Sequence, residues 1–139
     1  MVNGADAWRT VFVRQGRNQG MPFVTVYHWG LLRGEQETLR ELLPGVVSQA
    51  LHIENVTEAH LVPDDIRVKF VMGSEEDVRH ASRFGVEISA KYFPERAEIL
   101  EEAKETIKRA IQAAINPSDW FYLWVGLSEG VYAEGHGDL

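Results

Sequence analysis

Pro22 is the residue in this sequence whose position could give it unusual chemistry. It follows Met21 directly and opens a stretch of alternating apolar and polar residues, 23–27. If translation starts at Met21 and the methionine is removed, Pro22 becomes the amino terminus and its ring nitrogen a titratable secondary amine. Terminal amines titrate near ~8, and partial burial beside cations lowers that pKa, so the amine would act as a general base at neutral pH. The plainer interpretation is a proline that only begins a strand.

Two arginines could supply positive charge beside such a base. Arg33 follows the first predicted strand in a glycine-bounded turn, and Arg67 lies between Ile66 and Val68 in a second predicted strand. A guanidinium group can hold an anion through paired hydrogen bonds. The default interpretation of both is a solvated surface cation, in which case Arg67 and Lys69 form the polar half of an amphipathic strand.

Other kinds of site find little support in the sequence. The chain has no cysteine, which excludes disulfides and thiolate metal sites and makes a reducing cytoplasm the expected compartment. We expect no metal site, because the five histidines lack the spacing of metal ligands: His28, His52, His60, His80 and His136. The sequence also contains no glycine-rich phosphate loop and no nucleophile elbow.

Length and charge narrow the class of partner. The 139 residues suit one domain with its own core, and 21 acidic against 14 basic side chains give a net charge of −7. Such an acidic chain is a poor match for nucleic acid or an anionic membrane, which attract basic surfaces. No apolar run approaches the ~20 residues of a membrane span. Small molecules or other proteins are therefore the expected partners.

Residues 1–20 differ in composition from the rest of the chain, and we interpret them as a leader or N-terminal extension. Their charged side chains are three arginines and one aspartate: Arg9, Arg14, Arg17 and Asp6. They lack the apolar core of a secretory signal, and they lack the serines of an organellar transit peptide. Residues 15–17 can be encoded by a purine-rich ribosome-binding sequence just before Met21, which favours a mis-annotated leader. The alternative is an additional strand over residues 8–14.

The remaining chain, residues 21–139, predicts a single domain made of two similar units. In the first unit, about residues 22–72, apolar residues alternate as in a strand, then recur at helical spacing, then alternate again. The predicted elements are a strand at 23–27, a helix over 35–51 and a strand at 66–70, with residues 59–62 either beginning that strand or forming a short one. Pro44 and Gly45 predict a kink or break in the helix.

The second unit, about residues 84–127, repeats this pattern after a polar loop at 73–83. The predicted elements are a strand around Val86 and Ile88, a helix opened by Pro94 and continuing over 99–115, a strand at 120–125 and an extension over 128–139. A shift of 64 residues places Ala103 on Leu39, Ile107 on Leu43 and Ile111 on Val47. The same shift places Ala114 on Ala50 and Ile115 on Leu51. The chain therefore predicts a duplicated β-α-β unit.

A duplicated unit of this kind fits two α+β architectures. One is the ferredoxin-like sandwich, and the other is a four-stranded sheet with both helices on one face. Pro22 after a methionine, the strand that follows, and Glu35 and Gln36 thirteen and fourteen positions beyond the proline resemble the 4-oxalocrotonate tautomerase family. The resemblance extends as a tandem repeat over nearly all of residues 22–139. The second half is similar to an uncharacterised bacterial group within the tautomerase superfamily.

The resemblance implies the second architecture and a cofactor-free tautomerase or isomerase. It implies Pro22 as the catalytic base or acid, Arg33 and Arg67 as ligands of a 2-oxo acid carboxylate, and a homotrimer. A trimer would also cover the helix-free face of the sheet, including part of the aromatic cluster at 120–124. The alternative is a non-catalytic oligomeric binding protein of the same fold, in which residues 1–20 lock the Pro22 nitrogen in an amide.

Overall fold

Strand β1 (Phe23–His28) occupies the centre of a four-stranded sheet with the order β2-β1-β3-β4. The computed structural model describes residues 22–74, 83–115 and 120–130. β1 pairs in parallel with β2 (Arg67–Met72) and antiparallel with β3 (Phe84–Lys91), and β3 pairs in parallel with β4 (Phe121–Ser128). Each unit therefore contains its own parallel strand pair, and the two units meet where β1 lies against β3.

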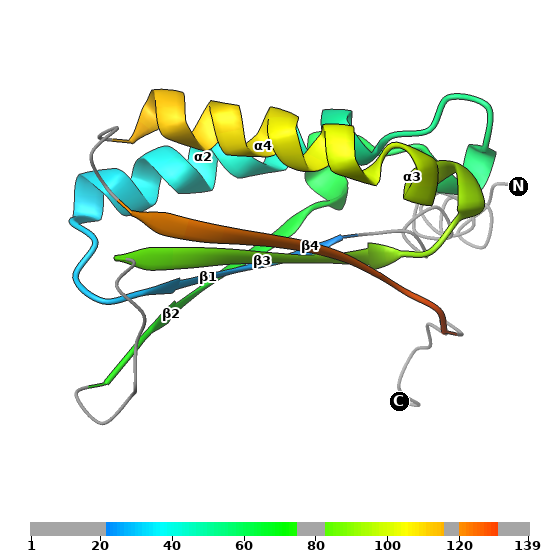
Figure 1. Cartoon of the computed structure of the whole chain (residues 1–139). Helices are drawn as coiled ribbons and strands as arrows, with labels where there is room; N and C mark the ends of the chain where they lie inside the picture. The colour runs from blue at the N-terminus through cyan, green and yellow to red at the C-terminus, as the bar shows by residue number, and fades with distance from the viewer. Residues whose placement is uncertain (1–21, 75–82, 116–119, 131–139) are drawn as a thin grey trace, which may run out of the picture.

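Both long helices cover one face of this sheet. α2 (Arg33–Leu51) and α4 (Leu100–Ala114) lie side by side above it, whereas no described helix lies against the other face (Figure 1). The predicted α+β arrangement is thus confirmed. The ferredoxin-like alternative is excluded, because its β-α-β unit is split by an inserted strand, and here β1 and β2 pair directly. No described helix combines the length and apolar character that a membrane crossing needs.

The core between helices and sheet confirms the internal repeat. Four residues at equivalent positions of each helix are buried, in pairs 64 residues apart: Leu39 and Ala103, Leu43 and Ile107, Val47 and Ile111, Leu51 and Ile115. They pack on the inward side chains of the central strands, Val24, Val26, Phe84, Val86 and Ile88. Ala50 and Ala114, the remaining predicted pair, are more exposed. The repeat is therefore a repeat of core-facing positions.

Pro44 does not break the first helix, so the predicted break was wrong. α2 continues through Pro44 as one helix of 19 residues. An interior proline loses one backbone hydrogen bond and costs about 3 kcal/mol. Leu43 and Val47 on either side of it are completely buried, and this packing on the sheet holds the helix together despite the loss.

Smaller differences concern the ends of elements. Residues 59–62 form no strand, and two short 3₁₀ helices precede β2 instead, η2 (Thr57–Ala59) and η3 (Pro63–Asp65). The second helical segment is divided at Ile99 into α3 (Pro94–Glu98) and α4, and β4 reaches Ser128. Several predictions concern residues outside the described ranges: the leader 1–20, most of the 73–83 loop with His80, the helix end at 116–117, and the extension beyond residue 130 with His136.

Candidate active site

Pro22 and Arg67 lie together at one end of the sheet. Pro22 is buried and immediately precedes β1. Arg67 is the first residue of β2 and pairs with Phe23, and its backbone N–H donates to the carbonyl oxygen of Pro22 at 3.3 Å. β1 and β2 are parallel, so their first residues lie at the same end of the sheet. The fold thus brings the candidate base and one candidate carboxylate ligand together across 45 residues of sequence (67 − 22).

The Arg67 side chain is directed over its neighbour on β1. Its guanidinium carbon lies 5.7 Å from the centre of the Phe23 ring, within the range of a cation–π contact. Arg67 remains exposed, and it forms no ion pair with any residue in the described ranges. The guanidinium group is therefore held beside the start of β1 with hydrogen-bond donors left for an anion.

Arg33 lies at the other end of the strand. It is the first residue of α2, which begins after β1 has ended, and its side chain is exposed. The six residues of β1 span roughly 20 Å, so within one chain Arg33 is far from Pro22. Of the two predicted arginines, the structure brings only Arg67 to the proline of the same chain.

An ion pair joins the two units at this far end. The Arg83 guanidinium donates to the Glu35 carboxylate at 2.7 Å, and the same carboxylate accepts the backbone N–H of Leu32 at 2.9 Å. These two contacts hold the pKa of Glu35 below its ordinary value, the Arg83 hydrogen bond contributing most. Glu35 is the acidic residue predicted for the first turn of the helix, and Arg83 precedes β3. This end of the sheet therefore has a structural ion pair rather than an open anion site.

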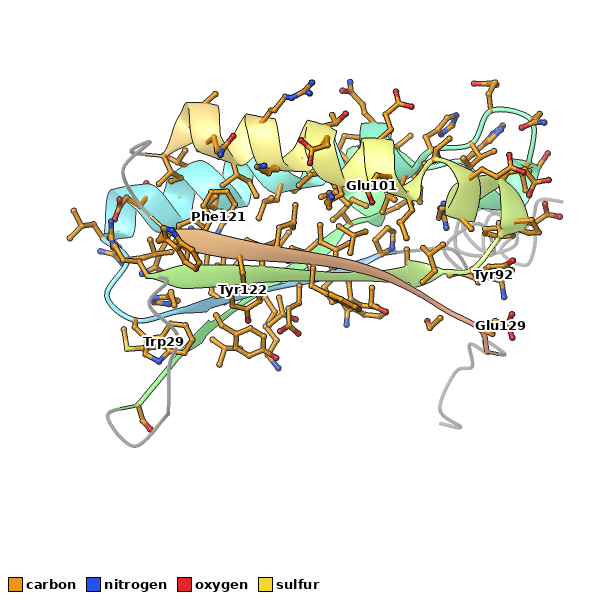
Figure 2. All side chains as sticks on the ribbon, in the orientation of Figure 1. Trp29, Tyr92, Glu101, Phe121, Tyr122 and Glu129 are labelled. Carbon is orange, nitrogen blue, oxygen red and sulfur yellow. The ribbon has the colours of Figure 1, made fainter. Side chains whose placement is uncertain are left out.

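The helix-free face of the sheet, here called the open face, carries a second group of polar and aromatic residues. The strand register places Lys69, Thr25, Glu87 and Trp124 in one row across the four strands. Tyr122 projects to this face while Phe121 projects to the helices, as Figure 2 shows. The Tyr122 hydroxyl donates to Glu87 at 3.0 Å. Burial, followed by this contact with Glu87, raises the pKa of Tyr122 to about 12.

A cavity of about 320 Å³ opens on this face. Phe23 and Trp124 form its sides, and both are largely solvent-exposed, at 48% and 65%. Thr25, Glu87, Ile88, Ser89, Gly126 and Leu127 complete the lining. Glu87 is a site residue that was not predicted from the sequence. The sequence feature that could have indicated it is the position of one carboxylate between Val86 and Ile88. In a strand, this alternation places the carboxylate on the face opposite the core.

Arg96 is a second charged residue that sequence reasoning missed. It is completely buried, and it donates to the backbone carbonyls of Leu51 at 2.9 Å, Lys91 at 3.0 Å and Ala59 at 3.3 Å. Burial lowers its pKa to about 10. Because it joins the end of α2 to the second unit and contacts no solvent, its role is structural.

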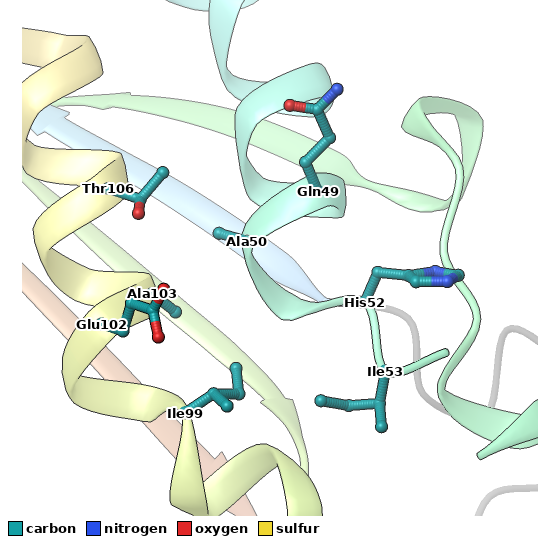
Figure 3. A pocket seen from close by; sticks show the side chains of 8 residues that line it. All are labelled: Gln49, Ala50, His52, Ile53, Ile99, Glu102, Ala103 and Thr106. Carbon is teal, nitrogen blue, oxygen red and sulfur yellow. The ribbon is translucent and has the colours of Figure 1, made fainter. Parts of the chain in front are cut away.

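A smaller cavity of about 280 Å³ lies between the end of α2 and the start of α4 (Figure 3). Ala50, Ile53, Ile99 and Ala103 supply its apolar surface, and Gln49, His52, Glu102 and Thr106 its polar rim. Its two titratable side chains, His52 and Glu102, form no hydrogen bond with each other, and the lining has no lysine or arginine that could hold an anion. We therefore place the candidate active site at the start of β1 and β2.

Three potential metal ligands, His52, Glu54 and His60, lie beside that helical cavity, with ligand atoms within 4.8 Å of one another. Their hydrogen bonds do not suit a metal. His52 Nδ1 accepts the backbone N–H of Leu61 at 2.9 Å, so the proton of the neutral ring is on Nε2. His60 Nε2 lies 2.6 Å from the Glu54 carbonyl and must donate to it. Metal-bound histidines instead donate from the nitrogen that is not coordinated, and Nε2 of both rings carries a proton here.

This sheet with two helices on one face is the fold of the tautomerase superfamily, as the resemblance predicted. The 5-carboxymethyl-2-hydroxymuconate delta-isomerase structure is similar with a TM-score of 0.60 and 15% identity, covering 86% of this chain and 90% of its own. A macrophage migration inhibitory factor-like protein of Entamoeba histolytica gives 0.54 at 10% identity, covering 84% and 96%. Leishmania major MIF2 gives 0.51 at 15% identity, covering 84% and 96%.

At these identities the likeness concerns the fold. No protein-family model and no curated protein sequence matches the chain.

Proposed function

We propose that the chain beginning at Pro22 is a cofactor-free tautomerase or isomerase that acts on a small 2-oxo acid or its enol. The observation that carries the proposal is the position of Pro22 beside Arg67 at the start of the paired strands β1 and β2, where the Pro22 carbonyl accepts the Arg67 N–H at 3.3 Å. A base and a carboxylate ligand are the minimum that an enol acid requires. The isomerase with the same fold supports this choice of reaction class.

The proposed reaction needs one amine and one cation. The Pro22 nitrogen, as a free base, takes the proton of the enol hydroxyl, and the O–H electron pair stays on the oxygen of the resulting enolate. That pair then forms the carbonyl bond as the carbon–carbon double-bond pair takes the proton from the prolinium, which forms the C–H bond and restores the amine. Arg67 holds the carboxylate and stabilises the charge of the intermediate enolate. Protons and electrons balance without a cofactor.

In this proposal, Arg33 contacts the substrate only in the active site of a neighbouring protomer. Its distance from Pro22 within one chain prevents it from reaching the same substrate, whereas a homotrimer could place it beside the proline of another protomer. The exposure of Phe23 and Trp124 on the open face supports such an assembly, because exposed apolar patches of this kind mark interfaces.

The activity of two forms of the chain tests the proposal. One form begins at Pro22 and the other at Met1, and ketonisation of enol-pyruvate is followed by its ultraviolet absorbance. We expect ketonisation above the buffer rate only from the form beginning at Pro22, because an amide nitrogen is not basic. If that form is folded and gives no rate above buffer, the enzyme proposal fails and the binding-protein alternative replaces it.

A further inference from the structure

A further cavity lies between α4 and the start of β4, on the helix-covered side of the sheet. Its volume is about 360 Å³, more than that of either cavity described above. α4 lies above β4 in Figure 1, and the cavity has one wall from each element. Phe121 of this wall pairs with Phe84, and Phe84 pairs in turn with His28, the last residue of β1. The cavity is therefore at the opposite end of the sheet from Pro22 of the same chain.

The β4 wall of this cavity offers two aromatic rings. The Phe121 ring is stacked on the ring of the completely buried Phe84, with 5.1 Å between ring centres, so its orientation is fixed. The Trp120 side chain is 60% exposed, while its backbone carbonyl accepts the Arg83 N–H at 2.8 Å. Leu123 adds apolar surface. A planar ring from outside the chain would stack here on surfaces that are already in place.

The α4 wall offers a positive charge and an amide. Lys104, Lys108 and Gln112 follow one another at intervals of four residues, so they form one row along the helix. Glu105, the one carboxylate of the lining, lies 3.6 Å from Lys104, which also contacts the largely exposed Glu101 outside the lining. Lys108 forms no ion pair with any residue that the structure describes. The lining, with two lysines and one glutamate, therefore has a net charge of +1 that is available at Lys108.

The internal repeat does not account for Lys108. The shift of 64 residues places it on Pro44 (108 − 64), so the repeated core requires no cation at this position. The same shift places Lys104 on Arg40, whose guanidinium carbon lies 5.2 Å from the centre of the Phe70 ring in its own unit. The second unit thus carries a cation, Lys108, that has no evident structural role.

We propose that this cavity binds an aromatic carboxylate, with the ligand ring stacked on Trp120 and the carboxylate paired with Lys108 and the Gln112 amide. A net charge of +1 matches the single charge of a carboxylate, whereas a phosphate monoester carries about −1.5 to −2 at neutral pH. The volume is near the lower end of the roughly 300–1,000 Å³ of small-ligand sites, which suits one ring or two fused rings. This second site goes beyond the proposed reaction, which uses none of these residues.

Nuclear magnetic resonance tests where such a ligand binds. 2-Naphthoate is titrated into the ¹⁵N-labelled chain, and the indole N–H signals of the four tryptophans are followed. The signal of Trp120 is identified by its absence from Trp120→Phe. We expect this signal to shift and to saturate at one ligand per chain, because a ring stacked beside the indole changes its chemical shift. The signal of Trp124, a similarly exposed tryptophan on the open face, should not shift.

The charge of the ligand should be coupled to Lys108. We expect Lys108→Gln to weaken the binding of 2-naphthoate roughly fivefold, the upper end of what an exposed charge pair contributes. The same substitution should leave the binding of naphthalene-2-carboxamide unchanged, because this ligand has nearly the same shape and no charge. Lys69→Gln, the matched change at an exposed site on β2, should alter the binding of neither ligand.

Three results would overturn the proposal. The first is a Trp120 signal that does not saturate with millimolar 2-naphthoate. The second is a shift of the Trp124 signal in its place, which would locate the ligand on the open face. The third is a Lys108→Gln variant, folded by circular dichroism, that binds 2-naphthoate as wild type does or weakens both ligands equally. Because the signal is local to Trp120 and the probe is not an enol acid, these results are independent of Pro22 and its proposed reaction.

Discussion

The Arg67 backbone N–H donates to the Pro22 carbonyl at 3.3 Å, and its side chain lies over the ring of Phe23, the residue next to the proline. This relationship follows from the parallel pairing of β1 and β2, which places the first residues of both strands at the same end of the sheet. In the proposed enzyme, the pairing makes Arg67 the carboxylate ligand that belongs to the same protomer as the base.

Replacement of Arg67 should impair substrate binding. We expect Arg67→Ala to raise KM for enol-pyruvate by at least about tenfold, because a charge-assisted hydrogen bond contributes about 1.5–3 kcal/mol. Arg33→Ala should raise KM less. Steady-state kinetics measure both, with Arg109→Ala, an exposed arginine on α4, as the matched control. Equal effects of Arg67→Ala and Arg109→Ala would contradict the assigned role.

Replacement of Pro22 should lower the chemical rate. In the form that begins at residue 22, Pro22→Ala retains a terminal amine but replaces the secondary amine of the rigid ring with a less basic, freely rotating primary amine. We expect kcat to fall by roughly one to a few decades, the range that general bases contribute. Circular dichroism of the variant controls for folding. An unchanged kcat in a folded variant would show that the amine is not the base.

The ion pair of Glu35 and Arg83 should make stability depend on pH. Since folding lowers the pKa of Glu35, its contribution is fully present above the unfolded value near ~4.3 and is lost as the pH falls through the lower folded value. Urea unfolding should therefore show a larger deficit for Glu35→Gln at pH 7 than at pH 3. Glu41→Gln, an exposed carboxylate of the same helix, is the control. Equal deficits of Glu35→Gln at both pH values would contradict this assignment.

Arg96 should be important for stability. Arg96→Leu leaves three backbone carbonyls without their donor, at Leu51, Lys91 and Ala59. We expect the free energy of unfolding to decrease by about 3 kcal/mol or more. Arg96→Lys should recover only part of this, because one ammonium group cannot reproduce the planar fork of a guanidinium. Urea denaturation measures both, and a loss for Arg96→Leu no larger than that for the exposed Arg109→Leu would contradict the structural role.

The repeat and its core could be predicted because they depend on local spacing. Leu39 and Ala103 have equivalent places in two helical patterns, and both are buried as that spacing requires. The proximity of Arg67 to Pro22 depends instead on which strands pair and in which register. The periodicity of residues within one strand does not reveal its partner strand or the register of the pair. At Pro44, local preference gave a wrong prediction. Proline favours a break in the helix, but the burial of Leu43 and Val47 against the sheet keeps the helix continuous.

Glu87 and Arg96 illustrate what periodicity could not reveal. Glu87 has a simple outward position in β3, and its surroundings come from the adjacent strands, where Trp124 is its neighbour on β4. Arg96 follows Pro94 at the beginning of α3, where an arginine ordinarily faces solvent. Its three acceptors come from separate parts of the chain, so only the tertiary structure explains its burial.

The titration of the Pro22 nitrogen tests the central claim most directly. In a chain that begins at Pro22 and is labelled with ¹⁵N-proline, nuclear magnetic resonance follows this nitrogen with pH, and kcat/KM is measured over the same range. A base must be deprotonated to act, so we expect kcat/KM to rise with pH through the same pKa that the nitrogen shows, at a value below the ~8 of an ordinary terminal amine. A nitrogen that titrates at or above ~8, or a kcat/KM that does not follow it, would contradict the account.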